Sequence, residues 1–311
     1  MIAVRHARAS DAGGILRTLA AAFEPYRHAY PEAAFHDTIL DAGLLQARMS
    51  RMAVLVAERD GEIVGTIAAG HVDPAEGHLR GMAVSPACEG AGVGRRLLHR
   101  ALDELTVAGC ARVTLDTTSV LVRAQRFYER AGFARTGRIA DFFGIPVHEF
   151  AMPLDRTFAF RDAAADDLPT VHRIINAAFL VERHFVTGDR IGEEELRRCF
   201  ENGTFLVAAR GGEPPSASLF LRPNGERRTY LGMLAVDTAL QRRRLGSLMM
   251  AAAERRCRLR GDEAIDINVV NLRTELPPFY LARGFVDTGT APLEDPRLFR
   301  PAHFRQMALI L

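Results

Sequence analysis

The sequence predicts an α/β protein with two tandem domains, each a twisted mixed sheet flanked by helices. One observation is the order of elements in the first half, where an antiparallel beginning is followed by a strand–helix–strand centre. A second is that the other half repeats this pattern at a constant offset of 152 positions. A chain of 311 residues also has the length expected of about two domains.

The elements of the first half follow from their patterns of apolar and turn residues. Ser10 or Asp11 is the expected N-cap of the first helix, and Asp60-Gly61 is typical of a tight hairpin turn. The expected elements are a strand at 2–8, a helix through Phe23, a helical region at 31–49, hairpin strands at 53–58 and 62–70, a strand at 78–84, a loop and helix at 89–108, a strand at 112–116, a helix with Tyr128, and closing strands near 133–140 and 146–154.

The repeat relates Val84 to Val236 and Tyr128 to Tyr280, and it needs no gap across more than fifty residues. Such self-similarity indicates an internal duplication. Residues 158–167 restart the strand-then-helix pattern of the N-terminus, so the predicted domains are 1–155 and 156–311.

A glycine-rich loop lies where the strand at 78–84 turns into a helix. Pro86 ends the strand, and Gly90, Gly92 and Gly94 precede an apolar helical stripe. Glycine permits a close approach of the backbone to a ligand, and a helix N-terminus presents unpaired N–H groups to phosphate. A tight turn would also account for the glycines alone, and the spacing matches neither a dinucleotide-binding fingerprint nor a Walker loop.

A second motif, Ala-x-x-Phe-Tyr-Glu-x-x-Gly-Phe at 124–133, follows downstream. Together with the loop it resembles the GNAT superfamily of acyl-CoA-dependent N-acyltransferases. Glu89 stands where the family has Gln or Arg, a tolerable change because the family uses mainly backbone donors there. The resemblance covers both halves and is strongest at 79–137 and 231–289.

The resemblance implies an N-acetyltransferase that moves an acetyl group from acetyl-CoA to a primary amine by direct attack. It implies Tyr128 as general acid to the CoA thiolate, with Tyr280 as its counterpart; a packed tyrosine is the alternative. In the first half the implied cofactor-binding residues are Met82, Ala83, Val84, Glu89, Gly90, Ala91, Gly92, Val93, Gly94 and Arg95. In the second half they are Leu234, Val236, Gln241, Arg242, Gly246 and Asn271.

The general base stays open at this stage. His78 could reach an acceptor pocket, or it could be a surface histidine at the start of a strand; Glu24 and Asp141 are other candidates. Asp116 could be a cap at the end of its strand. The residues expected along the acceptor pocket are Tyr26, His28, Tyr30 and His36.

The two halves differ in the loop, because Arg242 and Arg244 replace the glycines that match Gly90 and Gly92. A Cβ at Arg244 is expected to hold the backbone away from a pyrophosphate, so the first half should be the tighter site. Alternatively, Arg244 lies in the first helical turn and its guanidinium binds phosphate.

Composition narrows the remaining classes. A net charge of +2 gives no electrostatic case for nucleic acid or an anionic membrane, and no apolar run approaches the 18 or so residues of a membrane span. The four widely spaced cysteines favour the cytoplasm and predict neither disulfides nor a metal site. The acceptor, a small-molecule or peptide amine, and the oligomeric state stay open, and a non-catalytic acyl-CoA-binding or sensor protein is the alternative function.

Overall fold

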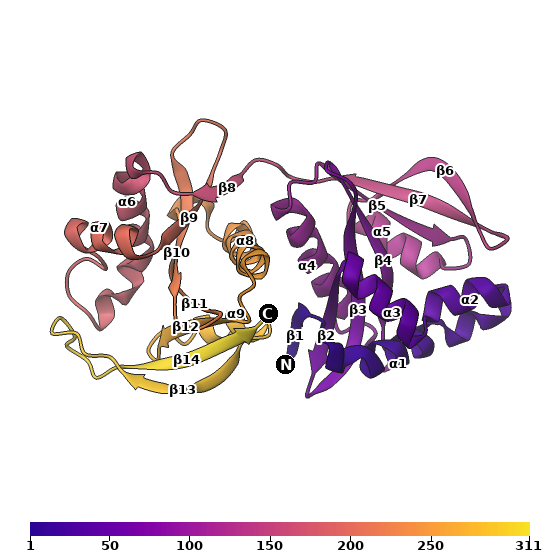
Figure 1. Ribbon diagram of the computed structural model, residues 1–311, viewed down its shortest axis with the longest axis horizontal. Coiled ribbons are helices and arrows are strands. Elements are labelled where there is room, and N and C mark those ends of the chain that lie inside the picture. Colours follow the sequence, from indigo (N-terminus) through magenta and orange to yellow (C-terminus); the bar gives the residue numbers. More distant parts are fainter. The chain divides into compact units, whose positions relative to one another are not determined.

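The computed structural model describes residues 1–311, which divide into two compact units, Met1–Arg156 and Thr157–Leu311. Each unit is a seven-stranded mixed sheet with helices on both faces, which confirms the predicted fold class (Figure 1). The units are described one at a time.

The sheet of the first unit has the order β1-β2-β3-β4-β5-β7-β6. Neighbouring strands are antiparallel except β4 and β5, which run parallel. Asp60 and Gly61 both have positive φ, as the predicted hairpin turn between β2 and β3 requires. The strands are β1 (Ile2–His6), β2 (Ala53–Arg59), β3 (Glu62–Asp73), β4 (Glu76–Val84), β5 (Arg112–Thr118), β6 (Ala134–Phe142) and β7 (Ile145–Pro153).

Helices cover both faces because alternate residues of the central strands are apolar on each side. On one face Ile15 of α1 and Leu45 of α3 pack on Val54 and Ala68. On the other face α4 and α5 pack on the alternate positions of the same strands. The helices are α1 (Ala12–Phe23), α2 (Glu32–Ile39), α3 (Ala42–Arg51), α4 (Val93–Val107) and α5 (Val122–Arg130), with short 3-10 turns η1 (Ala9–Asp11), η2 (Glu24–Ala29) and η3 (Pro86–Cys88).

The helical region expected at 31–49 consists of two helices, α2 and α3. Leu40 has φ of 62°, a left-handed conformation that ends α2. Asp41 then caps α3, because its side chain accepts a hydrogen bond from the backbone N–H of Leu44 at 2.8 Å. The second of these helices, α3, carries Arg48, which lies beside Gly81 of β4 in the site described below.

The second unit repeats the strand order of the first. Its order is β8-β9-β10-β11-β12-β14-β13, which corresponds strand by strand to that of the first unit. Its strands are β8 (Ala159–Asp162), β9 (Thr204–Ala209), β10 (Pro215–Pro223), β11 (Arg228–Val236), β12 (Ala264–Val270), β13 (Val286–Pro292) and β14 (His303–Ile310). Its helices are α6 (Leu168–Ala178), α7 (Glu193–Asn202), α8 (Leu245–Arg260) and α9 (Leu276–Leu281), with 3-10 turns η4 (Ala165–Asp167), η5 (Phe179–His184) and η6 (Thr238–Leu240).

One connection differs clearly between the units. Phe143 and Gly144 alone join β6 to β7, whereas residues 293–302 join β13 to β14. This longer segment is attached to the stretch after η5, where Val186 and Leu298 form an isolated bridge. The second unit therefore carries a strap that the first unit does not have.

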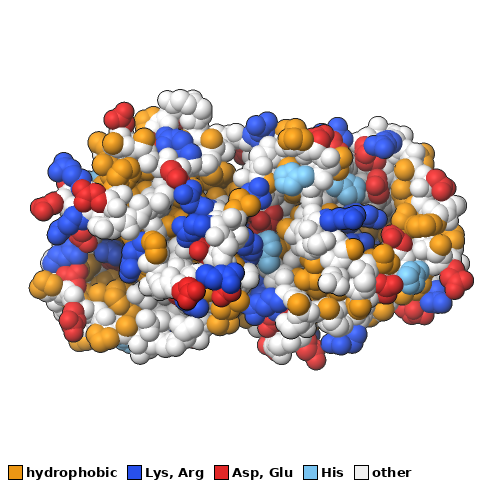
Figure 2. Space-filling view, in the orientation of Figure 1, with side chains coloured by type: hydrophobic (Ala, Val, Ile, Leu, Met, Phe, Trp, Pro, Cys, Tyr) orange, Lys and Arg blue, Asp and Glu red, His pale blue; other side chains and the backbone are white.

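Basic and acidic side chains are interspersed on the displayed face of each unit (Figure 2). This mixing agrees with the small net charge of +2. None of the helices combines the length and the apolar composition that crossing a bilayer would need.

Both units contain the same ion pair at the start of their first helix, and its burial differs. Arg5 and Asp11 approach to 2.6 Å with side chains 8% and 9% exposed, whereas Arg161 and Asp167 approach to 2.6 Å with Arg161 44% exposed. Both aspartates also accept a backbone N–H at 2.7 Å. The two sites differ in the burial of the arginine and in a second partner of Arg5, Glu58, at 2.7 Å.

We therefore expect Asp11→Ala to destabilise its unit by about 2 kcal/mol, because the buried guanidinium of Arg5 loses its hydrogen bonds to Asp11 and keeps only Glu58 as a carboxylate partner. Asp167→Ala should cost about 1 kcal/mol, because its arginine stays hydrated. Hydrogen exchange measured separately for peptides of each unit checks this order. Equal losses of protection in the two units would contradict the assigned role of burial.

Candidate active site of the first unit

The site forms where two parallel strands separate. β4 pairs with β5 from Glu76 with Arg112 to Leu79 with Leu115, and no further. Beyond this fork the backbone of Gly81–Val84 has no strand beside it on the β5 side. An unpaired strand edge of this kind can hydrogen-bond an extended ligand.

The glycine-rich loop follows directly at the end of β4. Gly90 and Gly92 have φ of 78° and 76°, and a Cβ at either position would meet no atom within 4 Å. These glycines are therefore needed for backbone conformation and leave open space in front of the loop. Gly92 is the N-cap of α4, and no side chain caps this helix, so its first N–H groups face that space.

Gly94 serves a different purpose. A Cβ there would lie 3.1 Å from the Cε of Met82, so this glycine lets the first turn of α4 pack closely against β4. Of the three loop glycines, Gly90 and Gly92 are needed for the backbone conformation, and Gly94 is needed for the close contact between α4 and β4.

The fork and the loop open into one cavity of about 1210 Å³ in the first unit. It is lined by β4, the loop, β5, α5, the end of α1 with η2, α2, α3, and the ends of β6 and β7 that lie next to their connection. Of the predicted cofactor-binding residues of this half, all except Ala91 line it: Met82, Ala83, Val84, Glu89, Gly90, Gly92, Val93, Gly94 and Arg95.

Tyr128 lies in this cavity on α5. Its ring is 8% exposed and packs edge-on against Phe127 and Phe133, and its hydroxyl donates to the Sδ of Met82 at 3.3 Å. Burial raises the pKa of Tyr128 far above its ordinary value, so the hydroxyl keeps its proton at neutral pH. A thioether sulfur is a weak hydrogen-bond acceptor, so the Tyr128 hydroxyl can readily donate its hydrogen bond to a stronger acceptor instead.

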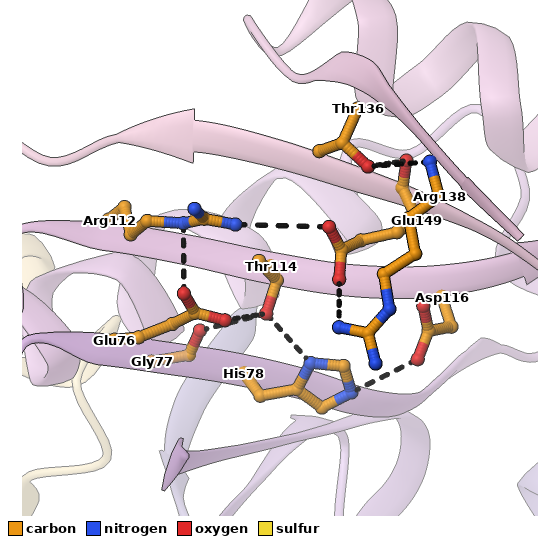
Figure 3. Close-up of polar contacts among 9 residues, drawn as sticks. All are labelled: Glu76, Gly77, His78, Arg112, Thr114, Asp116, Thr136, Arg138 and Glu149. Atoms are coloured by element: carbon orange, nitrogen blue, oxygen red, sulfur yellow. Dashed lines mark hydrogen bonds and ion pairs between the residues drawn. The ribbon is translucent and has the colours of Figure 1, made fainter. Parts of the chain in front are cut away.

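His78 lies at the fork, one residue before the last pair of β4 and β5. Its Nδ1 is 2.9 Å from the Oγ1 of Thr114, and its Nε2 is 3.8 Å from the Oδ2 of Asp116 (Figure 3). Both His78 and Asp116 line the cavity. His78 is thus a half-buried cavity residue rather than a histidine on the open surface.

The hydrogen bonds around Thr114 decide which nitrogen of His78 carries the proton. The Thr114 hydroxyl has a single proton, for which the Oε1 of Glu76 at 3.2 Å and the carbonyl of Gly77 at 3.3 Å compete (Figure 3). A carboxylate is the stronger acceptor, so Thr114 donates to Glu76 and accepts from Nδ1–H of His78. This tautomer leaves the Nε2 lone pair of His78 free.

A network of ion pairs holds Glu76 in place. Arg112 lies 3.0 Å from Glu76 and 3.8 Å from Glu149, and Arg138 lies 3.3 Å from Glu149 (Figure 3).

Partial burial lowers the pKa of His78, and the nearby Asp116 opposes that shift. His78 is therefore a neutral imidazole at pH 7.

The other candidates from the sequence fall inside and outside the cavity. Tyr26, Tyr30 and Asp141 line it, whereas Glu24, His28 and His36 do not. Glu89, which stands where the family has Gln or Arg, forms an exposed ion pair with Arg123 at 2.8 Å.

Several cavity residues were not predicted from the sequence, among them Arg48, Arg80 and Thr117. Arg48 is separated from the loop motif by more than thirty positions and comes to the cavity only through the packing of α3. Thr117 has a buried Oγ1 without a hydrogen-bond partner. Thr117 could have been found from the sequence, because the β-strand pattern of β5 continues past the point where it pairs with β4.

The second unit keeps the loop conformation in spite of its arginines. Arg242 and Arg244 have φ of 62° and 66°, close to the values of Gly90 and Gly92. Arg244 is the N-cap of α8 and is left-handed, so it does not lie in the first helical turn, the placement that the sequence left open. The left-handed conformation costs a residue with a Cβ about 1–2 kcal/mol, so both Arg242 and Arg244 are strained.

The remaining predicted residues of this unit occupy the corresponding elements. The amide of Gln241 donates to the carbonyl of Val236 at 3.2 Å, and Gly246 lies beside the same valine. Asn271 accepts from the backbone N–H of His303 at 2.9 Å, so its amide oxygen is bonded to the first residue of β14. Leu234 lies on β11, and Tyr280 is buried on α9, where burial raises its pKa to about 12.

The fork itself differs in the second unit. The 152-position offset places Tyr230 at His78 and Asn268 at Asp116. Met233 replaces Gly81, keeps a positive φ of 48°, and packs against an apolar cluster with Phe179. The second unit therefore has no imidazole or carboxylate at these two positions.

Sequence comparison identifies the class. The model of the Acetyltransferase (GNAT) family matches residues 15–133 and again 168–285. The chain belongs to this family and contains its domain twice, as the sequence analysis predicted. Members of the family use acetyl-CoA.

Individual relatives match parts of the chain. The N-acetylaspartate synthetase of Homo sapiens is 31% identical over 119 residues, which cover 38% of this chain and 39% of that protein. An uncharacterized N-acetyltransferase of Mycobacterium bovis is 33% identical over 106 residues, covering 32% of this chain and 68% of that protein. The chain thus spans about two fifths of the synthetases and about two thirds of the mycobacterial protein.

Among solved structures, the PaiA N-acetyltransferase of Thermoplasma acidophilum in complex with coenzyme A superposes with a TM-score of 0.43 at 16% identity. The alignment covers 49% of this chain and 99% of that chain.

The residues of the first unit fit coenzyme A in three respects. The open space at Gly90 and Gly92 adjoins unpaired N–H groups, which suit a pyrophosphate. The free edge of Gly81–Val84 suits the amides of a pantetheine arm. The unpartnered hydroxyl of Thr117 offers a further polar contact inside the same cavity.

The geometry around His78 predicts its titration. NMR of the imidazole should give a pKa below the ordinary value of about 6.5, because burial penalises the charged form. Asp116→Asn should lower this pKa further, since it removes the nearest negative charge, and Arg80→Gln should raise it, since it removes a nearby positive one. His78→Gln identifies the resonance. A pKa above 6.5, or one that Asp116→Asn leaves unchanged, would contradict this account of the fork.

Proposed function

We propose that this protein is an N-acetyltransferase that moves an acetyl group from acetyl-CoA to a primary amine, with its active site in the first unit. The observation that carries the proposal is that one cavity combines the glycine loop, the fork, Tyr128, and a neutral His78 beside Asp116. A GNAT fold alone would not assign chemistry, because one fold hosts many functions.

The acetyl thioester of the bound cofactor supplies the acyl group. The N–H groups at Gly92–Arg95 bind its pyrophosphate, and the free edge of β4 pairs with its extended arm. A backbone N–H of the same edge can stabilise the oxyanion that develops on the carbonyl. The loop and the edge thus hold the donor along one wall of the cavity.

His78 acts as the general base. An alkyl amine with a pKa of about 10.4 is only about 0.04% neutral at pH 7, so it needs a proton acceptor before its nitrogen can attack. The free Nε2 of His78 accepts this proton, and Asp116 at 3.8 Å stabilises the imidazolium that results. The Nδ1–H bond to Thr114 keeps the ring in the orientation that this transfer needs.

Tyr128 acts on the leaving group. Its hydroxyl exchanges the weak acceptor Met82 for the departing thiolate, donates a hydrogen bond to the sulfur, and then delivers its proton. The raised pKa of Tyr128 makes full proton transfer less favourable, since a thiol has a pKa near 8.5. Stabilisation of the sulfur by the hydrogen bond is therefore the larger part of its role.

The second unit serves as a degenerate or structural copy in this proposal. It has Tyr230 where the first unit has the base, and burial raises the pKa of this tyrosine. Met233 stands at the position of Gly81, beside which the first unit holds the guanidinium of Arg48. Its loop still has left-handed residues, but they are strained arginines rather than glycines.

Release of free thiol from acetyl-CoA, measured over a library of amine acceptors, tests the proposal. We expect acceptor-dependent release in the wild type and a loss of kcat of at least about 100-fold in His78→Gln, the lower bound for a lost general base. Calorimetry should show unchanged acetyl-CoA affinity in this variant. Binding of acetyl-CoA without release for any amine would instead favour the non-catalytic sensor.

The loop makes a second expectation. Gly92→Glu adds bulk and a negative charge in front of the pyrophosphate site, so acetyl-CoA affinity should fall at least tenfold, about 1.4 kcal/mol. Gly109→Glu is the matched control, because Gly109 has φ of 93° and equally open surroundings at the other end of α4. The idea fails if calorimetry gives the folded Gly92→Glu protein normal affinity, or if Gly109→Glu loses as much.

Tyr128→Phe should slow turnover more than it weakens cofactor binding. We expect kcat to fall by about 100-fold, the low end for general acid catalysis, because a thiolate is already a fair leaving group. Steady-state kinetics with a working acceptor, beside the acetyl-CoA dissociation constant, provide the measurement. A normal kcat would assign Tyr128 to packing alone.

A further inference from the structure

Two arginines line the acceptor side of the cavity, and one of them has no partner. Arg48 of α3 makes no hydrogen bond and no ion pair within the chain. Arg80 of β4 has only Asp37, at 3.4 Å. A guanidinium is charged at every physiological pH, so this corner holds two positive charges and one negative charge.

The fold makes room for the Arg48 guanidinium at the fork. A Cβ at Gly81 would overlap its Nη1, so the glycine is what lets this group lie against β4. Partial burial and the charge of Arg80 lower the pKa of Arg48, and the charge of Asp37 opposes this only in part, which means that the positive charge of Arg48 is held at a cost. A partly buried unpaired charge is stabilised most directly by an anion from a ligand.

The same corner is connected to the proposed base. His78 and Arg80 are alternate residues of one strand, so their side chains leave the same face about 7 Å apart. If the amine of a ligand lies at the Nε2 of His78, a second functional group a few bonds from that amine lies near Arg80 and Arg48. A second cationic group on that ligand would be repelled there.

We propose that the acceptor is an amino acid, whose carboxylate is bound by Arg48 and Arg80 while its amine faces His78. The inference rests on the proposed function of this site and names its substrate class. A monoanion neutralises the net single positive charge of Arg48, Arg80 and Asp37, whereas a phosphate dianion would exceed it and would face Asp37. A planar carboxylate also matches the paired N–H groups of a guanidinium.

The test compares amino acids with their own amides as acceptors. L-Phenylalanine, L-leucine and glycine are each paired with the corresponding amide, which differs only at the carboxylate. The amide has the more readily deprotonated amine, so amine basicity alone would favour it. We expect the acid to have at least tenfold higher kcat/KM, and Arg48→Gln to raise its KM at least tenfold with little change in kcat.

Arg51→Gln is the matched control, because Arg51 is exposed on the same helix and does not line the cavity. It should leave the preference for the acid unchanged. Amides used as well as acids, a preference that survives Arg48→Gln, or turnover of O-phosphoethanolamine above all amino acids would overturn the inference. The proposed function would stand in each of those cases.

A binding experiment separates the two levels. The shift in melting temperature that N-acetyl-L-phenylalanine or L-phenylalanine causes is measured without cofactor, in the wild type and in Arg48→Gln. We expect a stabilisation that Arg48→Gln abolishes and Arg51→Gln keeps. No stabilisation of the wild type would overturn the carboxylate site, whereas a protein that binds the acid but does not bind acetyl-CoA would refute the proposed function alone.

Discussion

The separation of β4 from β5 after Leu79 and Leu115 is the constraint on which the site depends. Parallel strands that stayed paired would use the backbone of Gly81–Val84 internally and would close the cavity. The fork instead gives a free strand edge and a path to the N-terminus of α4. It also places His78 where β4 is still paired with β5 and where Thr114 holds the imidazole ring. The positive φ of Gly81 marks the irregularity of β4 at this point.

The two units show how one backbone can be kept while its chemistry changes. Gly90 and Gly92 in the first unit, and Arg242 and Arg244 in the second, have the same left-handed conformation. Arginine adopts it at a cost that glycine does not have, so the surrounding fold, rather than local preference, imposes it. At the fork, by contrast, the change from His78 to Tyr230 alters the proton chemistry itself.

The sequence predicted the features that local patterns encode. Glycine spacing at a strand-to-helix junction located the loop, and the constant offset located the second unit. It could not predict the break at Leu40, because a leucine rarely adopts a left-handed conformation and tertiary packing decides it. The environment of His78 also escaped, since Thr114 and Asp116 reach it only through the register of β4 and β5. Arg48 escaped for the same reason: its position depends on how α3 packs over Gly81.

The central claim is that one unit of the pair is the working site. Calorimetric titration of the full chain with acetyl-CoA tests it most directly, because stoichiometry counts sites without knowledge of the acceptor. The account predicts one tight site per chain, with any second site at least about tenfold weaker, a difference of about 1.4 kcal/mol. Two equivalent sites per chain, or a single site that survives loss of the first loop, would contradict it.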